Sequence, residues 1–515
     1  MLNQHGHTSD RLLIPTLVAM VLTGTPASAG WPTDPATPLV IGTAEGIFGE
    51  RQSVVVTDDQ AVWVSWQDSF CVGSLRVQRI SADGTLLTHE GIDAQEDPTC
   101  GFILPPLMLA SQDAVVITRA QSTSSEHPIR SYSADGSERW VGGYALKESQ
   151  ALGAGTTLGN GDVLVTSSTF GGMIHVDRIN TSGQRVWAGQ SVFHNDAGSN
   201  FKLLACVPDA TGGSFIFWDS PGPYRRIARV RRINGDGTLA WAGSVRIFGD
   251  DIFNQGSRHT PPVAIGDGLG GSVFVWSHGQ ETGSTPVPIK MQRIAADGTL
   301  SFPVEGARVS DGSERQFDAD VERDAVTGDL LITWRDGFLE GTSVRAQRIT
   351  LAGERLWGDE GVQIAVLEDM NDQFDTVWSN GQLAVAIASE SGVVIHRVSA
   401  DGSPVPGVWV ASESGPADSP VIEPQSGGLV VSWQLDTPGI DDHLLALRFN
   451  ANGLLGGPMC SPADFTGDGS LDVFDVFAFL DVFNNAEPPA DFVPDGMFDV
   501  FDVFSFLDAF NAGCP

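Results

Sequence analysis

Positive charge is scarce in this chain of 515 residues. Lys and Arg together number 29 against 64 Asp and Glu, so the formal net charge at pH 7 is −35. Only three of the basic residues are lysines. A surface this acidic repels the phosphates of nucleic acids and the headgroups of anionic membranes, which excludes both as expected partners.

Long hydrophobic runs are also missing. The longest candidate, residues 12–23, has twelve residues, whereas a membrane span needs about 20. Arg11 precedes this run, and the small-residue step Ala27-Ser28-Ala29 follows it. Residues 1–29 are therefore predicted to be a secretory signal peptide that is removed after Ala29. The alternative is a buried N-terminal helix, against which Pro15 argues. We expect a secreted protein, extracellular or associated with a cell surface, with no membrane span in the mature chain.

Cysteine is rare, with five residues in the chain. No C-x-x-C pair occurs, which excludes a zinc ribbon and a thioredoxin-type site. Export permits disulfides. Cys460 and Cys514 bracket the C-terminal segment and are predicted to pair. Cys71 and Cys100 fall in one repeat region and form a second candidate pair, which leaves Cys206 as a buried thiol.

Sequence signatures of catalysis are absent as well. The chain has no H-E-x-x-H, G-x-S-x-G or P-loop motif, and its ten His show no spacing typical of metal ligands. Motifs therefore assign no catalytic residue.

Glycine, by contrast, is abundant, with 60 residues, and some of it marks an internal repeat. Segments such as VQRISADGTLL (77–87) and VRRINGDGTLAW (230–241) recur at spacings of 47 to 61 residues. An Arg stands five residues before the glycine in seven of the eight copies, and a Trp follows it by four in four of them. The glycines are Gly84, Gly136, Gly183, Gly237, Gly298, Gly353, Gly402 and Gly453.

Each repeat is predicted to hold four short strands. A second recurring piece, such as GGSFIFW (212–218) or GGSVFVW (270–276), lies upstream of each marker segment, and a further short apolar segment precedes it. Four strands per repeat, repeated eight times, are typical of a β-propeller, whose blades stack to complete the core. We predict a mainly β fold, with an eight-bladed propeller over residues 30–458 that looks like those of secreted bacterial proteins.

The two ends of the propeller are predicted to close the ring together. Trp31 and residues 38–46 match the tail of a repeat, as found in residues 361–369 after Trp357. The eighth unit ends soon after Gly453 and lacks such a tail. The N-terminal strand should therefore supply the outer strand of blade eight. An open β-solenoid, the alternative, would not need complementary half-units.

The repeated Trp and Arg are interpreted as structural. A Trp at one fixed position in several blades is predicted to anchor packing between blades. The repeated Arg is predicted to hydrogen-bond backbone or acidic groups between blades. A functional residue is expected to break the repeat rather than obey it.

The C-terminal segment differs in kind: it is rich in Phe and Asp, and it is duplicated as residues 463–484 and 490–511. The first copy begins with a pattern that fits a twelve-residue calcium loop. Its predicted oxygen ligands are Asp464, Thr466, Asp468, the carbonyl of Ser470, Asp472 and Asp475. The alternative is an acidic turn and helix cap without a metal.

The second copy is a weaker match. Position 3 of its loop is Val493, which has no side-chain oxygen. The remaining candidate ligands are in register: Asp491, Asp495, the carbonyl of Met497, Asp499 and Asp502. We expect Ca²⁺ at the first loop and leave the second site open.

Each loop runs directly into a helical pattern, and no helix precedes either loop. A tandem of such loop–helix units, with Asp at position 12, resembles the dockerin family over residues 463–511. The Gly513-Cys514 ending resembles a variant of that family. The resemblance implies a small α-helical, calcium-binding domain over residues 461–515 that docks onto a cohesin-like or cell-surface scaffold protein. Positions 10 and 11, polar in cellulolytic dockerins, are Val473-Phe474 and Val500-Phe501.

Two classes of function remain. The favoured one is a secreted binding or display protein, tethered by its dockerin-like domain. The alternative is an extracellular carbohydrate-active enzyme, a glycoside hydrolase or lyase acting on a polysaccharide, because dockerins often carry such enzymes and propellers can host paired carboxylates. Clustered, non-repeating acids and aromatics at the central mouth of the propeller would favour the enzyme. Repeat-equivalent residues there would favour binding.

Overall fold

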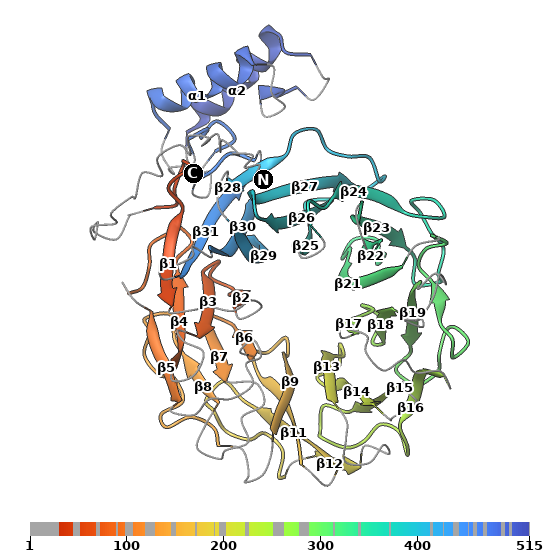
Figure 1. The fold of residues 1–515 in the computed structure, drawn as a ribbon. Helices are drawn as coiled ribbons and strands as arrows, with labels where there is room; N and C mark the ends of the chain where they lie inside the picture. Colours follow the sequence, from red (N-terminus) through yellow and green to blue (C-terminus); the bar gives the residue numbers. More distant parts are fainter. Residues whose placement is uncertain are drawn as a thin grey trace, which may run out of the picture.

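A computed structural model shows a ring of β-sheets with a small helical unit beside it (Figure 1). It describes residues 30–513 except for 45–51, 68–72, 89–90, 98–106, 119–128, 146–150, 170–171, 190, 195–201, 222–225, 251–261, 278–287, 313–314, 338–340, 370–371, 413–415, 426, 436–441, 452, 457–460, 467–470, 486–489 and 494–496. The predicted signal peptide, residues 1–29, lies outside the described residues. None of the described helices is long and apolar enough to cross a membrane.

Eight antiparallel sheets follow one another round the ring, and we number them as blades in chain order (Figure 1). Blade one consists of β2 (Ser53–Val56), β3 (Val62–Gln67), β4 (Gly73–Ile80) and β5 (Ile92–Asp97), and blade two of β6 (Leu107–Ser111), β7 (Ala114–Thr118) and β8 (Arg130–Tyr132). Blade three consists of β9 (Ala151–Thr157), β10 (Val163–Ser168), β11 (Met173–Ile179) and β12 (Ser191–His194), and blade four of β13 (Lys202–Pro208), β14 (Ser214–Pro221), β15 (Arg226–Ile233) and β16 (Val245–Asp250).

The second half of the ring repeats this order. Blade five consists of β17 (Val263–Gly266), β18 (Ser272–Ser277), β19 (Ile289–Ile294) and β20 (Ala307–Arg308), and blade six of β21 (Gln316–Arg323), β22 (Leu330–Asp336), β23 (Ser343–Ile349) and β24 (Val362–Val366). Blade seven consists of β25 (Gln373–Ser379), β26 (Gln382–Ser389), β27 (Gly392–Ser399) and β28 (Trp409–Ser412), and blade eight of β29 (Ala417–Gln425), β30 (Gly428–Leu435), β31 (Asp442–Asn450) and β1 (Leu39–Ala44). The predicted eight-bladed propeller is confirmed. In blade two, the bridge between Ile129 and Tyr144 marks the place of a fourth strand.

The first strand of each blade lies innermost and faces the axis of the ring (Figure 1). Alternating β-branched and aromatic residues on the other strands bury both faces of each blade against its neighbours, which completes the core.

The closure of the ring occurs as predicted. β1 pairs antiparallel with β31 and forms the outer strand of blade eight. Trp31 is buried, and its ring N–H donates to the carbonyl of Ala82 in blade one at 2.9 Å. Gly84, in the same turn, approaches so closely that a Cβ there would lie 2.4 Å from the backbone nitrogen of Trp31. The N-terminal segment therefore joins the last blade to the first.

The repeated Trp side chains act as anchors between blades, as predicted. The ring N–H of Trp187 in blade three donates to the carbonyl of Gly235 in blade four, and that of Trp241 in blade four donates to Ala296 in blade five. Gly237 adopts a φ of +86° beneath the Trp187 ring, and a Cβ there would lie 2.7 Å from it. Only glycine meets both requirements at this position.

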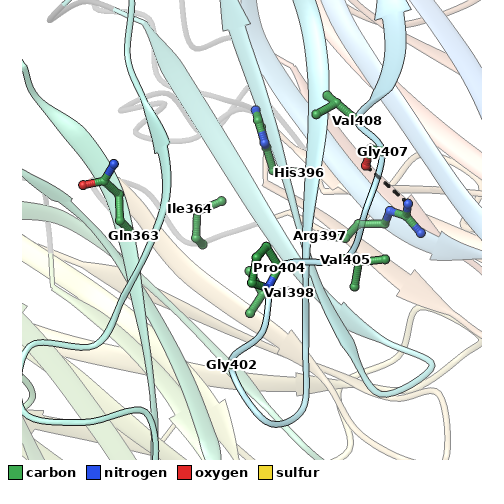
Figure 2. A pocket seen from close by; sticks show the side chains of 10 residues that line it. All are labelled: Gln363, Ile364, His396, Arg397, Val398, Gly402, Pro404, Val405, Gly407 and Val408. Carbon is green, nitrogen blue, oxygen red and sulfur yellow. Dashed lines mark hydrogen bonds between the residues drawn. The ribbon is translucent and has the colours of Figure 1, made fainter.

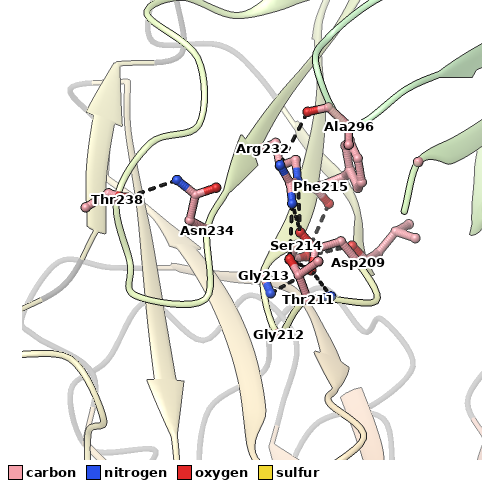
Figure 3. Close-up of polar contacts among 12 residues, drawn as sticks. Asp209, Thr211, Gly212, Gly213, Ser214, Phe215, Arg232, Asn234, Thr238 and Ala296 are labelled. Carbon is pink, nitrogen blue, oxygen red and sulfur yellow. Dashed lines mark hydrogen bonds and ion pairs between the residues drawn. The ribbon is translucent and has the colours of Figure 1, made fainter. Parts of the chain in front are cut away.

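The repeated Arg also joins neighbouring blades, as Figure 3 shows for Arg232. Its Nε donates to Asp209 within blade four at 2.8 Å, and its Nη1 donates to the carbonyl of Ala296 in blade five at 3.3 Å. Blades five and six have the same ion pair between equivalent residues: Arg293 with Asp267, and Arg348 with Asp324. In blade three the repeated Arg178 pairs instead with Asp162, which directly precedes the second strand. This confirms the structural interpretation of the Arg.

The helical unit consists of α1 (Val473–Asn484) and α2 (Val500–Ala512). Asp472 and Asp499 cap these helices, each in a reciprocal capping box with the Asp three residues later. The helices pack through Phe479 and Phe506, whose rings stack with centroids 4.0 Å apart. The predicted helical domain is present, with these two helices among the described residues.

Candidate functional site

Four carboxyl groups gather on the innermost strands of three consecutive blades. Asp320 and Glu322 come from β21 in blade six, Asp375 from β25 in blade seven, and Glu423 from β29 in blade eight. All four side chains are half-buried. We call these four residues the acidic seam. Their strands, β21, β25 and β29, are the innermost strands of one part of the ring (Figure 1).

The acidic seam breaks the repeat. In five blades the second strand has a Trp, which serves as a common reference point. The pairing of the innermost strand with this second strand then identifies two equivalent positions on the innermost strand. The first position is Ser53, Ala205, Val263, Asp320 and Val421, and the second is Val55, Val207, Ile265, Glu322 and Glu423. Asp375 in blade seven is the equivalent of Asp320. Blades one, four and five thus place apolar or small residues where blades six to eight place acids.

The carboxyls of the seam hold protons unusually tightly. Burial raises the pKa of Glu322 to about 8, with the neighbouring charges of Asp320 and Asp375 adding to the effect. Burial raises the pKa of Glu423 to about 8 as well, again with help from the other three carboxyls. The pKa of Asp375 rises to about 7 through burial and the charge of Asp320, and burial also raises the pKa of Asp320. Among the described residues, no Lys or Arg offsets these shifts.

Hydrogen bonds orient some of these carboxyls. Asp320 accepts from the hydroxyl of Thr376 at 2.6 Å, across the boundary between blades six and seven. Asp375 accepts from the backbone N–H of Ile422 at 2.8 Å, across the next boundary. Within the described part of the chain, the carboxyl of Glu423 receives no such bond. The seam therefore combines carboxyls that are oriented by hydrogen bonds with one, Glu423, that accepts none from the residues that the structure describes.

Aromatic residues flank the seam on the same strands. Phe317 precedes it on β21, and Phe374 precedes Asp375 on β25. The guanidinium of Arg335 lies over both rings, at 5.6 and 5.8 Å from their centroids, and donates to Asp318 at 3.0 Å. Asp318 adopts a φ of +53° where a bulge interrupts β21. A non-glycine residue in this conformation is strained, and such strain clusters at functional sites.

A pocket of about 180 Å³ lies elsewhere, between the outer strand of blade six and the third strand of blade seven (Figure 2). His396 faces it, and burial lowers the pKa of that imidazole. Arg397 at its edge stacks on Trp409 and donates to the carbonyl of Gly407. Arg397 is thus engaged in packing blade seven, which leaves His396 as the one titratable side chain free to act among the residues that line this pocket.

The first predicted calcium loop is only partly described, since Asp468 and Ser470 lie outside the described residues. Asp464 and Asp475 are completely buried. The Asp475 carboxylate accepts from the backbone N–H and the hydroxyl of Thr466, both at 2.9 Å, and from the backbone N–H of Asp472 at 2.8 Å. The loop therefore folds back onto its twelfth position, as a cation loop does.

The second loop repeats this arrangement. Asp502 accepts from the backbone N–H groups of Val493 and Asp499, both at 2.9 Å. Asp491 is half-buried and Met497 is exposed, while Asp495 lies outside the described residues. Among the residues that are described, no three His, Cys, Asp or Glu side chains are gathered as a preformed metal site.

The predicted disulfides cannot be placed, since Cys71, Cys100, Cys460 and Cys514 all lie outside the described residues. Cys206 is a free, buried thiol, as predicted. Burial raises its pKa to about 12, so it is unreactive.

Comparisons with known proteins give a limited result. No known protein family matches the chain, and no curated protein matches it by sequence. Solved structures that it resembles include the polysaccharide lyase Uly1, with 8% identity and a TM-score of 0.38 over 70% of this chain and 93% of that one. An α-L-arabinanase of Penicillium chrysogenum has 14% identity and a TM-score of 0.34 over 60% and 95% of the two chains. A prolyl endopeptidase has 13% identity and a TM-score of 0.38 over 67% and 49%. These likenesses are too low to support any conclusion about this chain.

Sequence reasoning missed the acidic seam. Its signal was present: aligning the short apolar segments that open each repeat places Asp320, Glu322, Asp375 and Glu423 at positions that are uncharged in the other blades compared. Only the ring arrangement shows that residues about fifty positions apart face one another.

Proposed function

We propose that the propeller is an extracellular carbohydrate-active enzyme, a glycoside hydrolase whose acid and base lie in the acidic seam. The observation that carries this proposal is the seam itself: acids that break the repeat, gathered on three innermost strands, with aromatic residues beside them. Glycosidases cleave their bond with two carboxyl groups, one protonated and one ionised. A seam in which Asp375 has a pKa of about 7 and Glu322 and Glu423 have pKa values of about 8 supplies both forms.

Glu423 is the candidate general acid. Its pKa of about 8 keeps it protonated at neutral pH, and its proton is not committed to a described protein group. Asp320 and Asp375 are the candidates for the base or nucleophile, because hydrogen bonds across the blade boundaries hold them in place and favour their ionised forms.

Hydrolysis fits the seam better than lyase chemistry. A lyase removes a proton next to the carboxylate of a uronate, and that carboxylate must be neutralised by a positive group. The pKa values of the seam carboxyls show no influence from any described Lys or Arg. Four carboxyls without a cation would repel an anionic sugar, so a neutral polysaccharide is the proposed substrate.

The test is a polysaccharide panel with release of reducing ends as the readout, using the full chain. Glu423→Gln and Asp375→Asn should each lower turnover at least about 100-fold, while polysaccharide binding in affinity gels persists. Glu360→Gln is the matched control, because that carboxylate is exposed on blade six, outside the seam. Full activity in Glu423→Gln, or no activity of the unmodified protein on any glycan, would refute the enzyme and return the propeller to a binding role.

A second function, a calcium-dependent tether, is proposed for residues 461–515. In support, Asp464 and Asp475 are fully buried and Asp502 nearly so, yet this segment contains no Lys, Arg or His. A buried carboxylate needs a compensating charge, and Ca²⁺ would supply it. Asp464, Thr466, Asp468, Ser470, Asp472 and Asp475 would hold the ion. The residues present fit the cation.

The same helices leave matching apolar side chains uncovered. Phe474 is 63% exposed and its counterpart Phe501 62% exposed, and Phe477 and Phe504 are likewise exposed. Exposed apolar patches of this kind mark protein–protein contact sites. We propose that they dock onto a cohesin-like scaffold at the cell surface. Calorimetry with CaCl₂ on the full chain tests the metal: Asp475→Ala should weaken binding more than Asp502→Ala, and equal binding in both variants and the unmodified chain would disprove the loop assignment.

A further inference from the structure

The last turn of the propeller departs from the seven turns before it. In those seven, the residue after the repeat glycine is polar: Thr85, Ser137, Gln184, Thr238, Thr299, Glu354 and Ser403. In blade eight the same position is Leu454, after Gly453. A leucine at a place that is otherwise polar breaks the repeat, just as the acidic seam does.

The backbone gives no reason for this change, because the turn itself keeps the common geometry. The N–H of Gly453 donates to the carbonyl of Asn450, as that of Gly84 donates to Ser81. The carbonyl of Leu454 accepts from the N–H of Asn450, as that of Thr85 accepts from Ser81. Only the side chain at this position differs, so the explanation for the leucine must lie in what its side chain contacts.

Leu454 packs against the core of the helical module. That core contains Phe465, Phe479 and Phe506, which are buried, and the half-buried Leu454 lies against it. Figure 1 shows α1 and α2 next to blade eight. The leucine is therefore the propeller's contribution to the hydrophobic core of the module.

The position of this contact within the ring is significant. The turn follows β31, which pairs with β30 on one side and with the closing strand β1 on the other. Leu455, the next residue, forms a bridge back to Phe449 on β31. Any element that holds this turn also holds the strand on which ring closure depends.

We infer that the helical module is a clasp on the propeller: docked through Leu454, it stabilises the closure of blade eight, in addition to any external partner it binds. The loss of the module's core or of this leucine should loosen the ring, because both remove packing from the end of β31. This inference does not depend on calcium or on the proposed enzymatic activity.

Two spectroscopic signals separate the ring from the module. All thirteen Trp lie between residues 31 and 433, so Trp fluorescence reports the ring alone. Both helices of the described chain belong to the module, so ellipticity at helical wavelengths reports the module. The full chain can therefore be followed in one sample without separating its parts.

The test is thermal unfolding of Leu454→Thr, which installs the residue found at this place in blades one, four and five. The Trp-monitored midpoint should fall by about 1–3 °C. Phe506→Ala, which disrupts the module core, should lower it similarly, and the double variant should add little because both changes remove one contact. Thr299→Leu, the reverse change in blade five, is the control and should leave the midpoint unchanged. An unchanged ring midpoint in Leu454→Thr, or a change confined to the helical signal, would overturn the clasp.

Discussion

Blades one, four and five and blades six to eight share one backbone plan but differ in the chemistry of their innermost strands. At equivalent positions, blade four has Ala205 and Val207, whereas blade six has Asp320 and Glu322. Val207 is buried in an apolar cluster that spans blades four and five. The same position of the same sheet thus serves as packing in one part of the ring and as a titrating group in another.

The difference shows where a repeat protein can change without losing its fold. The Trp, Gly and Arg that join blades are retained on both sides, because each supports the neighbouring blade as well as its own. The innermost strand pairs with a neighbour of its own sheet on one edge only, and it packs against the innermost strands of the adjacent blades. Burying acids there costs stability, and the packing of the other strands compensates for this loss.

The largest expected effect on stability comes from placing a seam acid in a blade that has an apolar residue at the equivalent position. Val207→Glu would put a carboxyl at the position of Glu322, in the apolar cluster between blades four and five and away from the seam acids. Burial of an unpaired polar group should destabilise the ring by about 3 kcal/mol. Denaturant unfolding monitored by Trp fluorescence measures it.

The reverse change, Glu322→Val, is the control for that swap. It removes a buried carboxyl from a crowded acidic set, so at pH 8 it should leave stability unchanged or increased. A large loss of stability in Glu322→Val would mean that the seam acids are structural supports.

The second prediction concerns pH. The pKa of Glu322 and of Glu423 rises from an ordinary 4.5 to about 8 in the folded chain. Between these values the folded state binds more protons than the unfolded state, so stability must fall as pH rises through this window. The unfolding midpoint should therefore decline from pH 5 to pH 8, by several degrees in all, and level off above it.

The double variant Glu322→Gln/Glu423→Gln tests the origin of that slope, because amides do not titrate. Its midpoint should vary much less over the same range. A slope that persists in the double variant would assign the pH dependence to the remaining acids of this highly charged chain.

The sequence predicted those features that recur from blade to blade. The Trp of one blade packs on the glycine turn of the next blade, as Trp187 does on Gly237. Because this contact recurs between blades, the residues that make it recur in the sequence and can be recognised without a structure. Leu454 and Glu423 were not recognised in advance, since each departs from the repeat for a reason that lies in contacts with other parts of the fold. The bulge at Asp318 also shifts the register of its strand, which obscures the alignment of acids between blades.

The smallest predicted effect concerns an exception in blade eight itself. Arg448 occupies the repeated Arg position, but its partner is Gln425, where blade four has Asp209. Arg448 is fully buried, and burial lowers its pKa to about 10. Gln425→Asp would restore the charged pair of the other blades.

Two opposing terms decide the result of Gln425→Asp. A charge-assisted hydrogen bond to Arg448 gains about 1.5–3 kcal/mol relative to no bond, compared with about 1 kcal/mol for a neutral one. The change also loses the bond from the Gln425 amide to the carbonyl of Gln60 in blade one, which costs about 1 kcal/mol. The net change in stability should thus lie between a loss of about 0.5 and a gain of about 1 kcal/mol, and Gln425→Asn, which keeps an amide but shortens the side chain, serves as the control. Destabilisation by Gln425→Asp beyond that of Gln425→Asn would show that blade eight requires a neutral partner because the acidic seam begins two residues away, at Glu423.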